Sequence, residues 1–143
     1  MMKHYTYSFN THQPMADVFA HLLDVRRWWS GLYEEKITGS SQQLNDEFSF
    51  AAGAGIHESR QRLIELVPDV RIVWLVTMSK LTFLSDPTEW EGTRIRFDLS
   101  ASGGGTHVTF VHEGLVPRLP CYDQCSNAWE QYLRKLEDSL NNK

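Results

Sequence analysis

The side chains best suited to metal or acid–base chemistry are six histidines, at positions 4, 12, 21, 57, 107 and 112. No two of them are four residues apart, the spacing that would place two metal ligands on one helix face. The pair His112-Glu113 is not followed by the second histidine of an HExxH motif. We therefore expect neither a metal site nor a cofactor.

His112 is the strongest single candidate for chemistry. It ends an alternating run in which it shares one face with Val108 and Phe110. If that face is buried, the imidazole borders an apolar interior, where it could orient a ligand or act as a general base. The alternative, which we favour, is a structural histidine at a strand end, partly solvated or bonded to the backbone.

Glu58 and Arg62 carry opposite charges and lie on one face of a predicted strand. They could pair across a cavity. We favour a solvated ion pair on the outer face, which would contribute little to stability.

Cys121 and Cys125 lie four residues apart on one predicted helix. This spacing is not the CxxC of redox motifs, and it is too short to join distant segments. We therefore expect two reduced thiols, buried as small apolar side chains.

No motif for phosphate binding or nucleophilic catalysis is present. The stretch 102–106, SGGGT, joins two predicted strands and lacks GxGxxG spacing, so it is predicted to be a hairpin turn. The sequence also has no GxSxG nucleophile elbow. Trp28, Trp74 and Trp129 could form flat apolar walls of a binding pocket, and plain core packing explains each equally well.

A long C-terminal helix and a series of strands must position these residues. Residues 121–140 form the helix, because apolar residues recur on one face at a spacing of three and four. Alternation predicts strands at 4–9, 35–39, 47–50, 56–67, 70–78, 93–99 and 106–113. Two short helices, 14–23 and 24–31, follow the first strand, the second ending at Gly31 in a left-handed cap. Residues 80–92 are predicted to be a loop whose Phe83 and Trp90 fold back onto the body.

This order predicts an α+β fold, in which the helices cover one face of an antiparallel sheet. A length of 143 residues fits a single domain, 1–143.

The net charge of −4 with scattered Lys and Arg excludes the basic patch typical of nucleic-acid binding, and it disfavours binding to anionic membranes. The longest apolar run, 72–76, is too short to span a bilayer, and no signal peptide is evident, so we expect a cytoplasmic protein.

Three groups of residues are informative as a set. They are Val18-Phe19 with the RWWS of 27–30, the ELVPDVRIVW of 65–74, and the GTRIRFDL of 92–99 with the TFVHEGL of 109–115, followed by Trp129 and Leu133. Together they resemble the START-like (SRPBCC) superfamily, and within it the branch of homologues of the activator of the 90-kDa heat-shock chaperone ATPase. The resemblance covers nearly the whole chain. In this branch the motifs are architectural, so it implies no catalytic residue.

The resemblance implies a helix-grip fold, in which a curved sheet of about six to seven strands wraps the C-terminal helix and leaves a cavity for an apolar or amphipathic ligand. Combined with strand parity, it gives the predicted lining: Trp28, Trp74, Phe97, Phe110, His112, Cys125, Trp129, Tyr132 and Leu133. The N-terminal half of the helix is expected to border the opening, while Leu136 and Leu140 seal the core.

Three functions follow as hypotheses. We favour a protein that binds a small hydrophobic molecule without catalysis, because no catalytic constellation is assembled in the sequence. The second is an enzyme of the cyclase or dehydratase kind that uses His112 with a carboxylate such as Glu58. The third is an interaction module of the co-chaperone kind; it ranks last because it rests on fold association alone. The sequence does not specify an oligomeric state.

Overall fold

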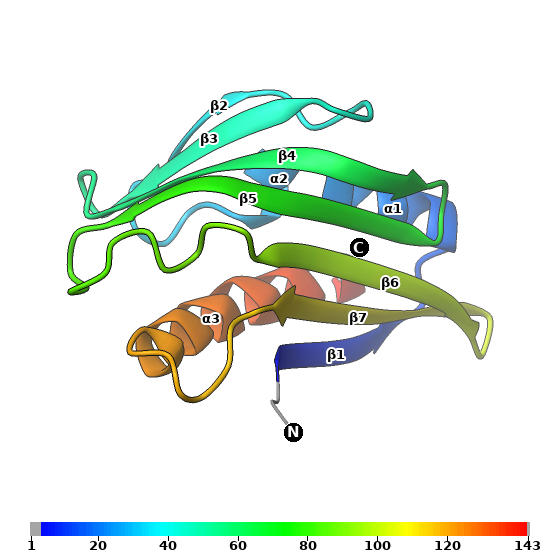
Figure 1. Cartoon of the computed structure of the whole chain (residues 1–143). Coiled ribbons are helices and arrows are strands. Elements are labelled where there is room, and N and C mark those ends of the chain that lie inside the picture. Colours follow the sequence, from blue (N-terminus) through cyan, green and yellow to red (C-terminus); the bar gives the residue numbers. More distant parts are fainter. Residues whose placement is uncertain (1–3, 143) are drawn as a thin grey trace.

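The computed structural model describes residues 4–142, and its elements follow the predicted order (Figure 1). They are β1 (Tyr5–Thr11), α1 (Met15–Leu23), α2 (Val25–Trp28), β2 (Lys36–Gly39), β3 (Glu47–Ala52), β4 (His57–Val67), β5 (Arg71–Leu81), β6 (Arg94–Ser102), β7 (Gly105–Glu113) and α3 (Tyr122–Asn141). The strands form one seven-stranded sheet in the order β1-β7-β6-β5-β4-β3-β2, and every neighbouring pair is antiparallel. The α+β fold class is confirmed.

All three helices lie on one side of the curved sheet, with α3 running behind β6 and β7 (Figure 1). Strand β6 shows why. Ile95, Phe97 and Leu99 are buried on the face toward the helices, while Arg96 and Asp98 alternate with them on the other face. The sheet therefore has one apolar and one polar face, and α3 packs against the apolar face.

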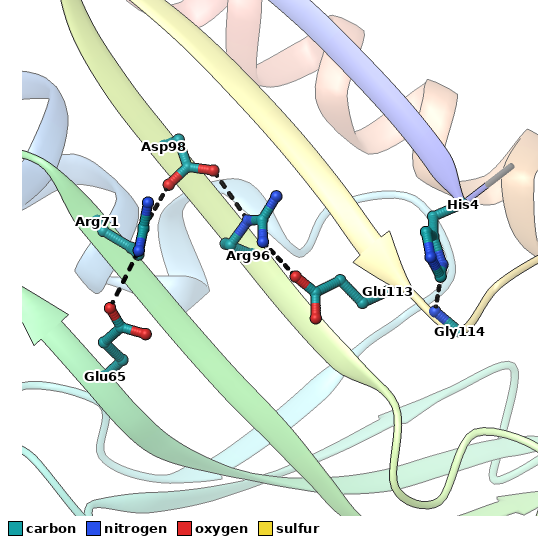
Figure 2. Close-up of polar contacts among 7 residues, drawn as sticks. All are labelled: His4, Glu65, Arg71, Arg96, Asp98, Glu113 and Gly114. Carbon is teal, nitrogen blue, oxygen red and sulfur yellow. Dashed lines mark hydrogen bonds and ion pairs between the residues drawn. The ribbon is translucent and has the colours of Figure 1, made fainter.

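Charged side chains connect four strands across the outer face. The chain of ion pairs runs from Glu65 to Arg71 (3.3 Å), Asp98 (2.6 Å), Arg96 (2.8 Å) and Glu113 (Figure 2). Figure 2 shows these side chains in one row over β4 to β7. Because they are partly exposed, each pair adds little to stability, but the row keeps this face solvated.

The core is built around Trp28, the last residue of α2. Its ring packs on Trp74 at 6.3 Å, Phe97 at 5.2 Å and Trp129 at 6.4 Å between ring centroids. Its indole N–H donates to the carbonyl oxygen of Leu22 at 2.8 Å, so this buried polar group is satisfied. These contacts fix α2 between the sheet and α3.

The helix predicted over 24–31 ends earlier, at Trp28. Gly31 has a left-handed φ of 87°, but it lies beyond the helix and does not cap it. The reason is a competing acceptor: the carboxylate of Glu35 receives the backbone N–H groups of Gly31 and Tyr33 at 2.8 and 3.0 Å. These N–H groups therefore stabilise a turn instead of another helical turn.

A β-bulge interrupts the strand expected at 70–78, which is part of β5. Gln61 of β4 pairs with Val76, but Arg60 pairs with Met78, so Thr77 is an extra residue. Val76 points inward, whereas Met78 borders a groove on the outer face. Within the described residues, no helix is both long and apolar enough to cross a membrane.

Candidate ligand-binding cavity

A cavity of about 290 Å³ opens beside the N-terminal half of α3. Four other segments complete its wall: the turn after α2, the end of β3 with the β3–β4 turn, the start of β4, and the connection between β5 and β6. The lining residues are Trp29, Tyr33, Phe50, Ala52, Gly53, Ile56, His57, Phe83, Trp90, Gln124, Cys125, Ala128, Trp129 and Tyr132.

Small residues explain why space remains at this end of the helix. Ala52 on β3 and Ala128 on α3 both border the cavity and stop at Cβ, and Gly53 has no side chain. Farther along α3, Leu133 and Leu136 are fully buried and fill the corresponding space. The cavity therefore lies beside the first half of the helix, where these small residues leave room.

The walls are mostly flat aromatic rings. Trp29 stacks on Phe50 with 4.2 Å between centroids and lies 4.9 Å from Trp129. On the other side, Trp90 stacks nearly parallel to Trp129, at 5.8 Å and 9°. Trp29, Phe50, Trp90 and Trp129 are each at most 3% exposed. Such rings offer large, rigid apolar surface, which suits a planar ligand.

His112 lies behind this wall and is fully buried. The indole N–H of Trp129 donates to its Nδ1 at 3.0 Å, so Nδ1 is an acceptor and the proton lies on Nε2. Nε2 then donates to Thr93 Oγ1 at 2.9 Å, and that hydroxyl donates to the carbonyl oxygen of Trp90 at 2.5 Å. Every donor and acceptor of the imidazole is used.

This network makes His112 structural. Burial, with smaller contributions from His57 and His4, lowers the pKa of His112 to about 3, so the ring is neutral. The sequence favoured a structural histidine that is partly solvated or bonded to the backbone. In the structure the partners of the His112 ring are instead the side chains of Thr93 and Trp129. Glu58 lies on the outer face of β4, opposite Lys80, and borders the outer groove. The geometry therefore does not bring His112 and Glu58 into one cavity.

Glu58 and Arg62 share the outer face of the sheet, but within residues 4–142 no ion pair joins them. Nor do any three His, Cys, Asp or Glu side chains in this range cluster closely enough to hold a metal ion.

His57, which was not among the predicted lining residues, lies at the start of β4 in the cavity wall. Its ring packs edge-to-face on Trp90 at 4.7 Å and on Phe50 at 5.3 Å. Its Nε2 is buried and has no hydrogen-bond partner among the described residues. Burial among these rings lowers the pKa of His57 to about 4, so the imidazole is neutral near pH 7.

A hydrogen-bonded carboxylate attaches the turn 31–35 to α3. Tyr132 donates its hydroxyl to Glu35 Oε2 at 2.5 Å, and Glu35 also holds the backbone of the turn. Burial alone would raise the pKa of Glu35, but the hydrogen bonds from Tyr132 and the backbone together lower it. Burial and the neighbouring Glu35 raise the pKa of Tyr132. This pair places Tyr33 and Tyr132 together in the cavity wall.

The expectation of two reduced thiols is wrong, because Cys121 and Cys125 form a disulfide. Their Cα atoms are 5.6 Å apart, a separation that one helical turn supplies and that suits a disulfide. Cys125 borders the cavity, and Cys121 Sγ accepts the indole N–H of Trp90 at 3.4 Å. The backbone N–H of Cys121 donates to Glu89 at 3.2 Å, which ties the β5–β6 connection to the start of α3.

The structure divides the predicted lining residues into two groups. Cys125, Trp129 and Tyr132 border the cavity. The others pack in the core behind it: Trp28, Trp74, Phe97, Phe110, His112 and Leu133.

Some lining residues that were not predicted could have been found from the sequence. Phe50 and His57 follow from strand parity, since Phe50, Ala52 and His57 share the inner face of the β3–β4 pair. Trp90 folds back as expected and is 3% exposed, whereas Phe83 borders the cavity but stays 42% exposed.

Most of the chain matches a known protein family. Residues 13–141 match the family described as Activator of Hsp90 ATPase homolog 1-like protein. The chain belongs to this family. The match covers most of the sequence and confirms the resemblance inferred from its motifs.

Solved structures show the same fold. The Aha1 dimer from Colwellia psychrerythraea aligns with a TM-score of 0.76 and 20% identity over 98% of this chain and 97% of that one. A protein from Chromobacterium violaceum gives 0.69 and 21% over 95% and 96% of the two chains. One from Mesorhizobium loti gives 0.72 and 17% over 95% of each. No curated protein sequence matches the chain. The helix-grip fold is confirmed, and it is compatible with small-molecule binding.

Proposed function

We propose that this protein binds a small, neutral, largely apolar molecule in the cavity beside the N-terminal half of α3. The observation that carries the proposal is a cavity of about 290 Å³ walled by stacked aromatic rings. A dry apolar cavity of about 150 Å³ holds benzene, so this one has room for about two fused rings. Pockets for organic ligands are concave and mainly apolar, with few polar groups, and this wall has that character.

The composition of the wall favours a neutral ligand. None of the lining residues is Lys, Arg, Asp or Glu, and His57 is neutral near pH 7 because burial lowers its pKa. A charged ligand would lose its hydration without gaining a counter-ion, which is costly. The ligand class we propose is therefore an uncharged aromatic or polycyclic compound.

Binding without turnover is favoured over catalysis by the placement of the candidate acid–base groups. Both ring nitrogens of His112 are already bonded to Trp129 and Thr93. Glu58 lies across the sheet from the cavity. A reacting molecule in the cavity would meet neither group.

Titration calorimetry with 2-naphthol at pH 7 tests this function. Wild type should bind one equivalent, and at 100 times Kd the ligand should stabilise the fold by about 2.7 kcal/mol. Ala128→Trp should abolish binding, because the indole would fill the cavity that Ala128 borders. The matched control is Asn127→Trp, at an exposed neighbouring position on α3, which should bind like wild type.

The charged analogue 2-naphthoate should bind at least about tenfold more weakly than 2-naphthol, because the wall offers no cation. Equal binding of 2-naphthol to wild type and Ala128→Trp, or no binding to either, would reject the proposed function.

A further inference from the structure

His57 differs from the other polar side chains around the cavity. The hydroxyl of Tyr132 is committed to Glu35, and that of Tyr33 donates to Gln131 at 3.0 Å. Nε2 of His57 has no partner within residues 4–142, although it is buried beside the rings of the wall. His57 therefore brings to the wall a buried nitrogen without a partner, whereas the remaining polar side chain of the lining, Gln124, is exposed to solvent.

His112 makes this contrast sharper. It is fully buried and, like His57, it is neutral and packs against Trp90, at 4.6 Å. The fold supplies both of its nitrogens with partners, Trp129 and Thr93. An unpaired buried polar atom is unfavourable, and native structures rarely leave one without a reason. For His57 the missing partner fits a ligand, because its side chain is part of the cavity wall.

We propose that His57 is the polar anchor of the cavity and that the ligand is a phenol or another aromatic alcohol, whose hydroxyl hydrogen-bonds to Nε2 of His57. This inference rests on the proposed function and specifies its ligand. A hydroxyl is the best complement because a neutral imidazole presents either a donor or an acceptor at Nε2, depending on its tautomer, and a hydroxyl can serve as the partner of either. A carbonyl could only accept, and an ammonium group would find no anion in the wall.

The test compares 2-naphthol with naphthalene, which has the same rings without the hydroxyl. Affinities are measured by NMR shift titration of the 15N-labelled protein, with the His57 ring nitrogens observed directly. Wild type should bind 2-naphthol about 3- to 10-fold more tightly than naphthalene, the range of one neutral hydrogen bond. The Nε2 resonance of His57 should shift with 2-naphthol and move much less with naphthalene.

Two substitutions separate the hydrogen bond from the shape of the wall. His57→Phe should keep the affinity for naphthalene within about twofold and lose the preference for 2-naphthol. His57→Gln, which retains a donor and an acceptor, should keep part of that preference. His12→Gln, at an exposed histidine remote from the lining, should leave both affinities unchanged.

Equal affinity of wild type for the two ligands would reject His57 as the polar anchor but would leave the proposed function in place. A preference for 2-naphthol that survives in His57→Phe would overturn it as well. If wild type bound neither ligand, the proposed function itself would fail, and the anchor with it.

Discussion

Two histidines that pack against Trp90 show how the same side chain takes two roles. His112 is closed into a hydrogen-bond network that ties α3 to the strand β7 and to the β5–β6 connection. His57 sits in the cavity wall with its Nε2 unpaired. Both are desolvated, and burial lowers the pKa of each, to about 3 and about 4 respectively. Their difference lies in hydrogen bonding, which burial alone does not reveal.

The lowered pKa values predict acid sensitivity. Histidine in the unfolded chain titrates near 6.5, so as the pH falls below about 6.5 the unfolded state takes up protons that the folded state excludes. Above about pH 6.5 the two histidines do not make the free energy of unfolding depend on pH. Below it, down to the folded-state pKa of about 4 for His57, each should remove about 1.4 kcal/mol of stability per pH unit.

Urea unfolding of wild type, His57→Gln and His12→Gln at pH 7, 6 and 5 would measure this loss. His57→Gln should show about half the wild-type slope between pH 6 and 5, while His12→Gln, at an exposed site, should keep the full slope. A wild-type stability that does not change from pH 7 to 5 would contradict the assignment.

Among the elements, the turn 31–35 depends most on a single interaction. Tyr132→Phe removes the hydroxyl that Glu35 accepts at 2.5 Å, and we expect a loss of about 1–2 kcal/mol in the free energy of unfolding. The affinity for 2-naphthol should also fall, because Tyr33 and the turn would no longer be held against α3. Chemical unfolding and calorimetry measure the two effects.

Tyr7→Phe is the matched control for this change. Tyr7 on β1 donates its hydroxyl to Glu137 near the other end of α3, at 2.7 Å, and it does not border the cavity. Its loss should lower stability by a similar amount without changing the affinity for 2-naphthol. If both variants bound the ligand like wild type, the turn would not be part of the site.

At the start of α3, the disulfide closes a very short loop. The chain-entropy relation gives about 2 kcal/mol as the most that such a loop can contribute. Reduction should therefore lower the free energy of unfolding by no more than this and leave the fold intact. Protein purified without reductant, denatured and treated with iodoacetamide, should show no alkylated cysteine by intact mass. Two alkylated cysteines would instead favour the free thiols expected from the sequence.

Across the whole molecule, periodicity predicted the elements well because it reflects burial. The helix expected at 121–140 is observed at Tyr122–Asn141, and the hairpin expected from 93–99 and 106–113 corresponds to β6 and β7. In that hairpin Phe97 lies opposite Phe110, as a shared inner face requires. Patterns of period 2 and 3.6 identify the face that turns inward, and this was enough for the fold.

The cavity was less predictable, because facing inward does not distinguish core from pocket. Phe97 and Phe110 were predicted to line the cavity, but they lie 5.1 Å apart and are sealed by Trp28 and Trp129. The empty space depends instead on small residues meeting across different elements, such as Ala52 and Ala128. The placement of small residues from different elements around one space is a property of the tertiary structure, and no periodic pattern in the sequence indicates it.

The central claim is that this cavity holds a small aromatic molecule, and a crystal structure with 6-bromo-2-naphthol tests it most directly. Anomalous scattering from bromine locates the ligand independently of any model of its shape. We expect one bromine peak inside the cavity, with the rings between Trp29, Trp90 and Trp129 and the hydroxyl within hydrogen-bonding distance of His57 Nε2. Bromine peaks only on the outer surface, or an empty cavity at saturating ligand, would contradict the claim.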